Sequence, residues 1–323
     1  MSKKSRIFLV GGTGTIGRAS VQALIARGHE VVCFLRNPEA RNNPALAGAT
    51  LRFGDVMDAA SLERDGFQGE HFDVVVSTLA SRTGVARDAW AIDYKAHAQL
   101  LQVAKAAAVP HMVLLSAICV QKPLLAFQHA KLAFEQELIA SGLAYSIIRP
   151  TAFFKSLSGQ VERVKAGKPY LIFGDGRLTS CKPISDDDLG YFIADCVSDE
   201  SKRNQILPIG GPGDALTPRE QGELIFAALG REPKFKSVPL GLLKSAHAVL
   251  SLLGRFNQSL ADKAELAGIG LYYASESMLV LDPSTGEYDA MRTPSTGKDT
   301  LAQHYARLIK GEIADDRGEH AVF

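Results

Sequence analysis

Three glycines near the start of the chain have the spacing of a turn that binds phosphate. Gly11, Gly14 and Gly17 lie in the segment VGGTGTIG, between an apolar run at 7–10 and a helix-like segment at 18–26. Such a turn needs residues without a Cβ, because the backbone bends tightly and a pyrophosphate group comes close to it. The helix that follows directs unpaired N–H groups and the positive end of its dipole at the phosphates. We therefore predict a dinucleotide site, with an ordinary glycine-rich turn as the alternative. Contacts in this turn are expected from Gly11, Thr13, Gly14, Thr15, Ile16 and Gly17.

The end of the second predicted strand indicates which dinucleotide is bound. The strand at 30–35 ends at Arg36, and no Asp or Glu occupies positions 34–38. In this architecture an acidic residue about 20 positions beyond the glycines binds the ribose 2′-hydroxyl, whereas an arginine suits a 2′-phosphate. The guanidinium of Arg36 can hold a phosphate with two hydrogen bonds and stack on adenine. We predict NADPH rather than NADH, and a solvated arginine at a strand end is the alternative.

Further cofactor contacts are expected where later strands end, because ligands of such sheets lie at the carboxyl ends of the strands. These strands are predicted at 50–53, 72–78, 111–116 and 144–148. The residues at or just beyond their ends that we expect to contact the cofactor are Asp55, Val56, Leu79, Ala80, Ser116, Pro150 and Phe153. Asp55 is placed to meet the edge of adenine, and Val56 could cover its face.

Strands and helices alternate along most of the chain. Helices are predicted at 89–107 and 126–135, and a late strand at 205–209 closes the series. This alternation predicts an α/β fold with a doubly wound, Rossmann-like parallel sheet and right-handed crossovers.

The length of 323 residues allows one large domain or two closely packed ones. We expect residues 1–153 and about 183–210 to form the dinucleotide-binding domain. The remainder, about 154–182 and 211–323, has weaker periodicity and is expected to form a smaller, mainly C-terminal substrate lobe. The polar stretch 312–323 is expected to fray.

The charge and composition exclude several classes of partner. The chain has 36 basic and 35 acidic residues and shows no basic stripe, so a nucleic-acid partner is not expected. The eight histidines show no ligand spacing, and no metal site is expected. The four cysteines form no C-x-x-C pair, which favours a reduced, cytoplasmic protein. We expect no signal peptide and no transmembrane segment, because no apolar run approaches about 20 residues.

One predicted helix has an apolar and a polar face. Its apolar positions are Leu242, Leu243, Ala246, Val249, Leu250 and Leu253. Its polar positions are Lys244, His247, Ser251 and Arg255. We expect the apolar face to pack against the core or a substrate, and a helix on a membrane surface is the alternative.

The glycine turn, the strand order and Lys131 resemble the atypical branch of the short-chain dehydrogenase/reductase superfamily. That superfamily usually carries Y-x-x-x-K on this helix, where the tyrosine gives a proton to a carbonyl oxygen and the lysine holds the nicotinamide ribose. Here Phe127 stands four residues before Lys131. Because phenylalanine has no proton to give, carbonyl chemistry through this position is not expected.

Longer segments resemble the divinyl chlorophyllide 8-vinyl reductases. They lie at 116–131, 149–156, 274–279 and 293–301. The resemblance implies NADPH-dependent reduction of the 8-vinyl group of divinyl chlorophyllide or protochlorophyllide to ethyl, in chlorophyll or bacteriochlorophyll biosynthesis. It also implies a catalytic role for Lys131, which would orient the ribose and add positive charge near the nicotinamide.

The missing tyrosine is consistent with that reaction. Hydride addition to a vinyl group conjugated with a tetrapyrrole leaves negative charge spread through the macrocycle, so no alkoxide needs a proton. The protein must supply positioning and water exclusion, and a proton must later reach carbon. Phe127 could pack against the nicotinamide or the macrocycle, or occupy a plain core position.

Several roles and readings stay open. Candidate proton donors are Tyr272, Tyr273 and His129, and candidate partners for the substrate propionate are Lys122, Lys155 and Arg82. Rival functions are reduction of another conjugated alkene, or a non-catalytic NADP-binding sensor or assembly factor. Contact with a photosynthetic membrane surface also stays open, as do the choice between the two pigment substrates and the oligomeric state.

Overall fold

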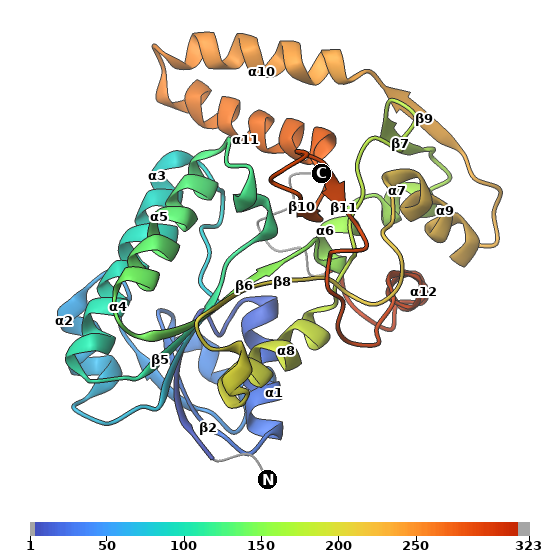
Figure 1. The fold of residues 1–323 in the computed structure, drawn as a ribbon. Helices are drawn as coiled ribbons and strands as arrows, with labels where there is room; N and C mark the ends of the chain where they lie inside the picture. The colour runs from blue at the N-terminus through green and yellow to red at the C-terminus, as the bar shows by residue number, and fades with distance from the viewer. Residues whose placement is uncertain (1–3, 316–323) are drawn as a thin grey trace.

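A seven-stranded parallel sheet forms the centre of the computed structural model, which describes residues 4–315 (Figure 1). Its strand order is β3-β2-β1-β4-β5-β6-β8. The strands are β1 (Arg6–Val10), β2 (Glu30–Leu35), β3 (Thr50–Phe53), β4 (Val74–Ser77), β5 (His111–Leu115), β6 (Ala144–Pro150) and β8 (Gln205–Ile209). The chain winds outward from β1 to β3 and then crosses to β4 on the other side. The predicted doubly wound sheet is confirmed, and its switch point lies between β1 and β4.

Helices cover both faces of this sheet. On one face lie α1 (Thr15–Ala26) and α8 (Asp186–Ser198), and on the other lie α4 (His97–Ala106) and α5 (Ala126–Ala140) (Figure 1). The short elements along the same part of the chain are η1 (Pro38–Asn42), η2 (Pro44–Leu46), α2 (Ala59–Ser61), η3 (Leu62–Phe67), η5 (Ile118–Gln121) and η6 (Glu200–Lys202).

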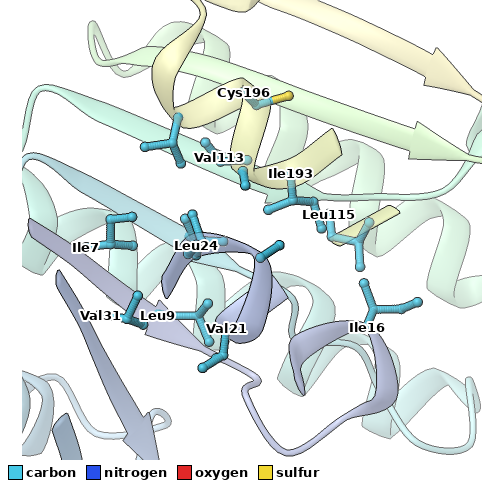
Figure 2. Close-up of a cluster of buried hydrophobic side chains, with 14 of the residues drawn as sticks. Ile7, Leu9, Ile16, Val21, Leu24, Val31, Val113, Leu115, Ile193 and Cys196 are labelled. Carbon is cyan, nitrogen blue, oxygen red and sulfur yellow. The ribbon is translucent and has the colours of Figure 1, made fainter. Parts of the chain in front are cut away.

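The alternation of side chains along β1 explains how one strand supports both layers. Ile7 and Leu9 pack in the cluster with α1 and α8, which Figure 2 shows, whereas Phe8 and Val10 pack in the cluster with α4 and α5. Successive side chains of a strand point to opposite faces, and both faces of a parallel sheet are buried. The strand is therefore held rigidly where it ends in the glycine turn.

The helix predicted at 89–107 is not regular. It consists of α3 (Ala86–Ala89), a π-helical turn η4 (Trp90–Ala96) and then α4. A π-turn inserts an extra residue into the helical repeat, and such turns are frequent at functional sites. Asp93 lies in this turn and is buried.

A separate hydrophobic cluster, which includes Tyr170, Phe226 and Tyr305, lies within the residues that we assign to the smaller lobe. Its elements are α6 (Phe154–Leu157), α7 (Val161–Lys165), β7 (Tyr170–Phe173), α9 (Pro218–Ala228), β9 (Phe235–Val238), β10 (Val280–Leu281), β11 (Tyr288–Asp289) and α12 (Leu301–Lys310). The division of the chain into two parts stays our proposal. The segment around 295–299, which we assigned to the smaller lobe, binds to the dinucleotide-binding part instead. Ser295 pairs with Gly210 beyond β8, and Asp188 of α8 accepts hydrogen bonds from the backbone of Lys298 and Asp299.

Two helices lie over the carboxyl ends of the strands. The inner one is α11 (Gln258–Ser275), and α10 (Leu240–Gly254) lies outside it at the edge of the molecule (Figure 1). The apolar face predicted for the helix around 242–253 does not pack against the core as a whole, because Leu242, Val249 and Leu253 are exposed. Leu243 and Leu250 of that face are half-buried. Residues 312–315 form no helix or strand, and the rest of the stretch predicted to fray lies outside the described residues.

Candidate functional site

The glycine turn leaves the first turn of α1 open to an anion. Gly14 is the N-cap of α1, no side chain caps this end, and no acidic residue lies in the first turn. Gly11 has φ +85°, and a Cβ on Gly17 would come within 2.1 Å of the carbonyl oxygen of Gly11. A Cβ on Gly14 would meet only that oxygen, at 3.6 Å. Gly11 and Gly17 thus shape the turn, and the geometry fits a pyrophosphate group in front of Gly14.

A lysine from the smaller lobe lies at this turn. Nζ of Lys155, on α6, is 2.5 Å from Oγ1 of Thr15. Asp186, at the start of α8, is close to both, and burial raises the pKa of its carboxyl while Lys155 and Thr15 oppose that shift. Lys155 was a sequence candidate for the substrate propionate, but the structure places it beside the phosphate turn.

Arg36 and Asp55 emerge at the same edge of the sheet. They follow the neighbouring strands β2 and β3, whose last residues, Leu35 and Phe53, are paired. Both side chains are exposed, and Oδ1 of Asp55 accepts a hydrogen bond from the backbone of Met57 at 2.9 Å. The arrangement leaves the guanidinium of Arg36 accessible to a ligand at the carboxyl end of β2.

A buried ion pair lies beside the loop that follows β4. Nζ of Lys131, on α5, is 2.9 Å from Oδ1 of Asp93 in the π-turn. The same oxygen accepts a hydrogen bond from the backbone N–H of Ser81 at 3.3 Å, just beyond the predicted contacts Leu79 and Ala80. Asp93 therefore links the lysine to this loop. Sequence reasoning missed Asp93, because nothing in its local pattern shows that a π-turn directs it inward.

His97 completes the buried polar group around Lys131. Its Nε2 lies 2.8 Å from Oγ of Ser77, and its Nδ1 lies 2.9 Å from the carbonyl oxygen of Ile92. Burial, together with the charge of Lys131, lowers the pKa of His97 to about 4. The ring is therefore neutral at pH 7. Because the Ile92 oxygen can only accept, Nδ1 carries the proton and Ser77 donates to Nε2.

Ser116 is engaged by a second buried charge. Its hydroxyl donates a short hydrogen bond to Glu135 of α5, which also forms an ion pair with Arg149 at the end of β6. Glu135 is buried and was not identified from the sequence. This network joins the ends of β5 and β6 to α5, the helix that carries Lys131. Two more predicted cofactor contacts, Pro150 and Phe153, lie at or beyond the end of β6. Pro150 is buried, and Phe153 is half-buried against the hydrophobic cluster under α1 and α8.

An apolar cluster covers this end of the sheet. Phe127 is half-buried against a cluster that includes Ile118, Cys119 and Ile269, the last of which comes from α11. We call this cluster the roof; its described members also include Leu125, Cys181, Tyr272 and Met278. The roof can keep water away from the neighbouring face of the sheet.

The candidate proton donors differ in their surroundings. The hydroxyl of Tyr272 donates to the carbonyl oxygens of Cys119 at 2.9 Å and Lys122 at 3.1 Å, so it holds the roof together. The ring of Tyr273 is partly exposed, but its hydroxyl lies beside the Cys119 thiol, and burial of that hydroxyl raises its pKa. His129 is exposed on α5.

Two of the segments that carry the family resemblance contact each other. Nζ of Lys122 lies 2.7 Å from both carboxylate oxygens of Glu276, and Tyr288 donates to the same carboxylate at 2.8 Å. The side-chain oxygen of Gln121 accepts from the backbone of Leu281 at 2.9 Å. Lys122, a sequence candidate for the propionate, is thus paired within the protein.

None of the helices within residues 4–315 has both the length and the apolar character needed to cross a membrane. In the same part of the chain, no group of three or more His, Cys, Asp or Glu side chains is arranged to hold a metal ion.

Comparison with solved structures shows the same fold elsewhere. An NADPH-dependent quinone oxidoreductase of Escherichia coli, solved with NADPH, superposes with a TM-score of 0.68 over 94% of this chain and 99% of that one, at 20% identity. The protein AtPrR2, solved with NADP+ and (+)pinoresinol, gives 0.64 over 95% and 99% of the two chains, at 18% identity. At these identities the likeness is one of fold alone.

Comparison with known sequences shows the family. The NAD(P)H-binding family profile matches residues 11–200. A divinyl chlorophyllide a 8-vinyl-reductase of Cucumis sativus is 52% identical over 99% of this chain and 80% of its own length, and that of Arabidopsis thaliana is 51% identical over 98% and 80%. A photosystem II assembly factor of Synechocystis is 23% identical over 94% and 92%. With half of its residues shared along nearly its whole length, this NAD(P)H-binding chain belongs to the divinyl chlorophyllide a 8-vinyl-reductase family.

Proposed function

We propose that this protein uses NADPH to reduce the 8-vinyl group of divinyl chlorophyllide or protochlorophyllide to an ethyl group. The observation that carries the proposal is that Lys131 is present, whereas Phe127 occupies the position where the Y-x-x-x-K motif has its tyrosine. The lysine is held by Asp93 at the loop after β4, whereas Phe127, at the place of the tyrosine, belongs to the apolar roof. This arrangement suits hydride transfer to a conjugated carbon better than reduction of a carbonyl.

The residues present fit NADPH, which supplies a hydride when bound. Backbone N–H groups of the glycine turn would hold the pyrophosphate, together with Lys155. Arg36 would bind the 2′-phosphate at the carboxyl end of β2. Lys131 would hold the hydroxyls of the nicotinamide ribose with the donors that it does not use on Asp93.

The contribution of the chain to catalysis is then mainly geometric. Lys131 would orient the ribose and so help to set the position of the nicotinamide relative to the substrate. Phe127 and the rest of the roof exclude water from the reacting atoms. The macrocycle accepts the charge that develops, so the protein needs no oxyanion site, and a proton at the other vinyl carbon completes the ethyl group.

The experiment incubates purified protein with NADPH and divinyl chlorophyllide and follows the shift of the Soret band, with the product identified by mass. We expect a gain of two hydrogens, and Lys131→Ala should greatly slow the reaction. Lys95→Ala, an exposed change on the same side of the sheet, is the matched control. NADPH binding without vinyl reduction would support the sensor or assembly-factor reading instead. If the protein reduced other conjugated alkenes but not the pigment, the result would support the rival function of a reductase with a different substrate.

We also propose a cytoplasmic location with peripheral contact to a photosynthetic membrane. The plant relatives are described as chloroplastic, and that description belongs to them. The apolar macrocycle of the proposed substrate favours a lipid phase over water, which supports a meeting of enzyme and substrate at a membrane surface.

A further inference from the structure

The outer helix α10 presents an apolar face to solvent. Leu242, Val249 and Phe256 recur every seven residues, or two helical turns, and therefore lie on one side of the helix and its extension. Leu252 lies close to the same side. Phe256 is 87% exposed, Leu242 66% and Leu252 58%. These four side chains, with Leu253, are called the outer face below.

The opposite side of α10 is already used for packing. A Cβ on Gly268 of α11 would lie 3.1 Å from Nε2 of His247, and a Cβ on Gly254 would lie 2.8 Å from the backbone of Ala261. Figure 1 shows α11 between α10 and the sheet. The outer face is therefore not a lid over the roof. It points away from the rest of the described chain.

The segment that carries the outer face contains basic residues but no acidic ones. Residues 233–261 contain four basic residues and no Asp or Glu, in a chain whose net charge is only +1. Lys244 and Arg255 lie on α10 and its C-cap and are exposed, while Lys234 and Lys236 precede the helix and are also exposed. A helix with exposed apolar side chains on one face and basic side chains on its polar face is typical of helices that lie in the interface of an anionic membrane.

We infer that the outer face of α10 docks on a bilayer surface that carries anionic headgroups. The apolar side chains would enter the boundary of the acyl chains, and Lys244 and Arg255 would reach the headgroups along their flexible stems. A second copy of the chain is a poorer occupant, because a symmetric contact would bring two acid-free basic segments together. This inference deepens the proposed membrane contact by naming the element and the lipid charge, and it does not depend on the proposed reaction.

The test measures co-flotation of the full chain with vesicles of phosphatidylcholine alone and with an equal mixture of phosphatidylglycerol and phosphatidylcholine. We expect binding to the mixed vesicles, weakened by salt. Leu252→Asp and Phe256→Asp should each reduce the partition coefficient about tenfold or more, because each removes an apolar anchor. The double change Lys244→Glu and Arg255→Glu should reduce it at least as much. The matched control is Leu178→Asp in the smaller lobe, whose residue is also 58% exposed.

The outcomes separate this inference from its rivals. Failure of the wild type to float with mixed vesicles, or equal loss in Leu178→Asp and Leu252→Asp, would overturn it. Equal binding to both kinds of vesicle would overturn the assignment of anionic lipid. Sedimentation velocity tests the second copy: a dimer that Leu252→Asp converts to a monomer would contradict membrane docking. Vinyl reduction of a detergent-dispersed substrate by Leu252→Asp should match the wild type, so a failed reductase assay and a failed flotation assay remain distinct results.

Discussion

The ammonium group of Lys131 lies 2.9 Å from the carboxylate of Asp93, and both side chains are almost completely shielded from water. Asp93 lies in the π-turn of the helix after β4, and this turn packs against α5. Ser81 and Lys131 share one carboxylate oxygen, so the lysine, the loop after β4 and the π-turn form one unit. The position of the residue that we assign to the ribose thus depends on an acidic residue 38 positions earlier in the chain.

Asp93→Asn should leave the buried ammonium of Lys131 without a counter-charge. Removing one partner of a buried pair typically costs about 3–5 kcal/mol, whereas replacing both by apolar residues costs much less. We expect Asp93→Asn to lower the free energy of unfolding in urea by an amount in this range. The double variant Asp93→Leu with Lys131→Met should recover part of that loss. Equal stability of Asp93→Asn and the wild type would contradict the role of the pair.

Arg36→Ala should change the choice of cofactor. Charge-assisted hydrogen bonds to the 2′-phosphate contribute roughly 1.5–3 kcal/mol, so affinity for NADPH should fall about tenfold or more. Affinity for NADH, which lacks this phosphate, should hardly change. Calorimetric titration with both dinucleotides provides the measurement, and equal losses for the two would reject the assignment.

Lys155→Ala should act differently from Arg36→Ala. If Lys155 contacts the pyrophosphate, which both dinucleotides carry, affinity for NADPH and for NADH should fall by the same factor, about tenfold. Lys155→Arg should restore much of it. An unchanged NADPH affinity with a raised KM for the pigment would instead return Lys155 to the substrate propionate.

Phe127→Tyr should not accelerate vinyl reduction. The added hydroxyl restores the proton donor of carbonyl reductases but places a polar group in the apolar roof, so the rate should stay the same or fall. Single-turnover kinetics with the divinyl substrate measure the chemical step directly. A large acceleration would show that an alkoxide-like charge does develop, and the mechanism proposed above would be wrong.

The neutral, buried His97 should make the protein less stable as the pH falls. Its pKa is about 4 in the folded state and about 6.5 when unfolded, so between these values the unfolded chain binds more protons. This contribution is intact above pH 6.5 and is lost as the pH falls toward 4, by about 2 kcal/mol between pH 7 and pH 5. The free energy of unfolding in urea is measured for the wild type and for His97→Asn at pH 7 and pH 5. The difference between the two proteins isolates the contribution of His97, because the other groups titrate alike in the two proteins. A pH dependence that is identical in the two proteins would contradict a neutral His97.

The parts of the molecule that could be predicted from the sequence are those that depend on local patterns. The glycine turn, the apolar strands and their order follow from spacing and from the rules of parallel sheets, and Lys131 and Phe127 from their place on one helix. Asp93 could not be predicted, because nothing in its local pattern indicates a π-turn or an inward-facing carboxylate. Lys155 reaches Thr15 only because the chain returns to the glycine turn after β6. The stripe on α10 indicated an apolar face, but its partner is decided by tertiary packing, in which α11 occupies the other side.

The central claim is that a hydride passes from NADPH to the 8-vinyl group of the pigment. It is tested most directly with two preparations of NADPH, each deuterated at C4 on one face of the nicotinamide, in a reaction with divinyl chlorophyllide. We expect the 8-ethyl product from one preparation to carry one deuterium, and the product from the other preparation to carry none. An ethyl product without deuterium from either preparation, or no ethyl product at all, would contradict the account.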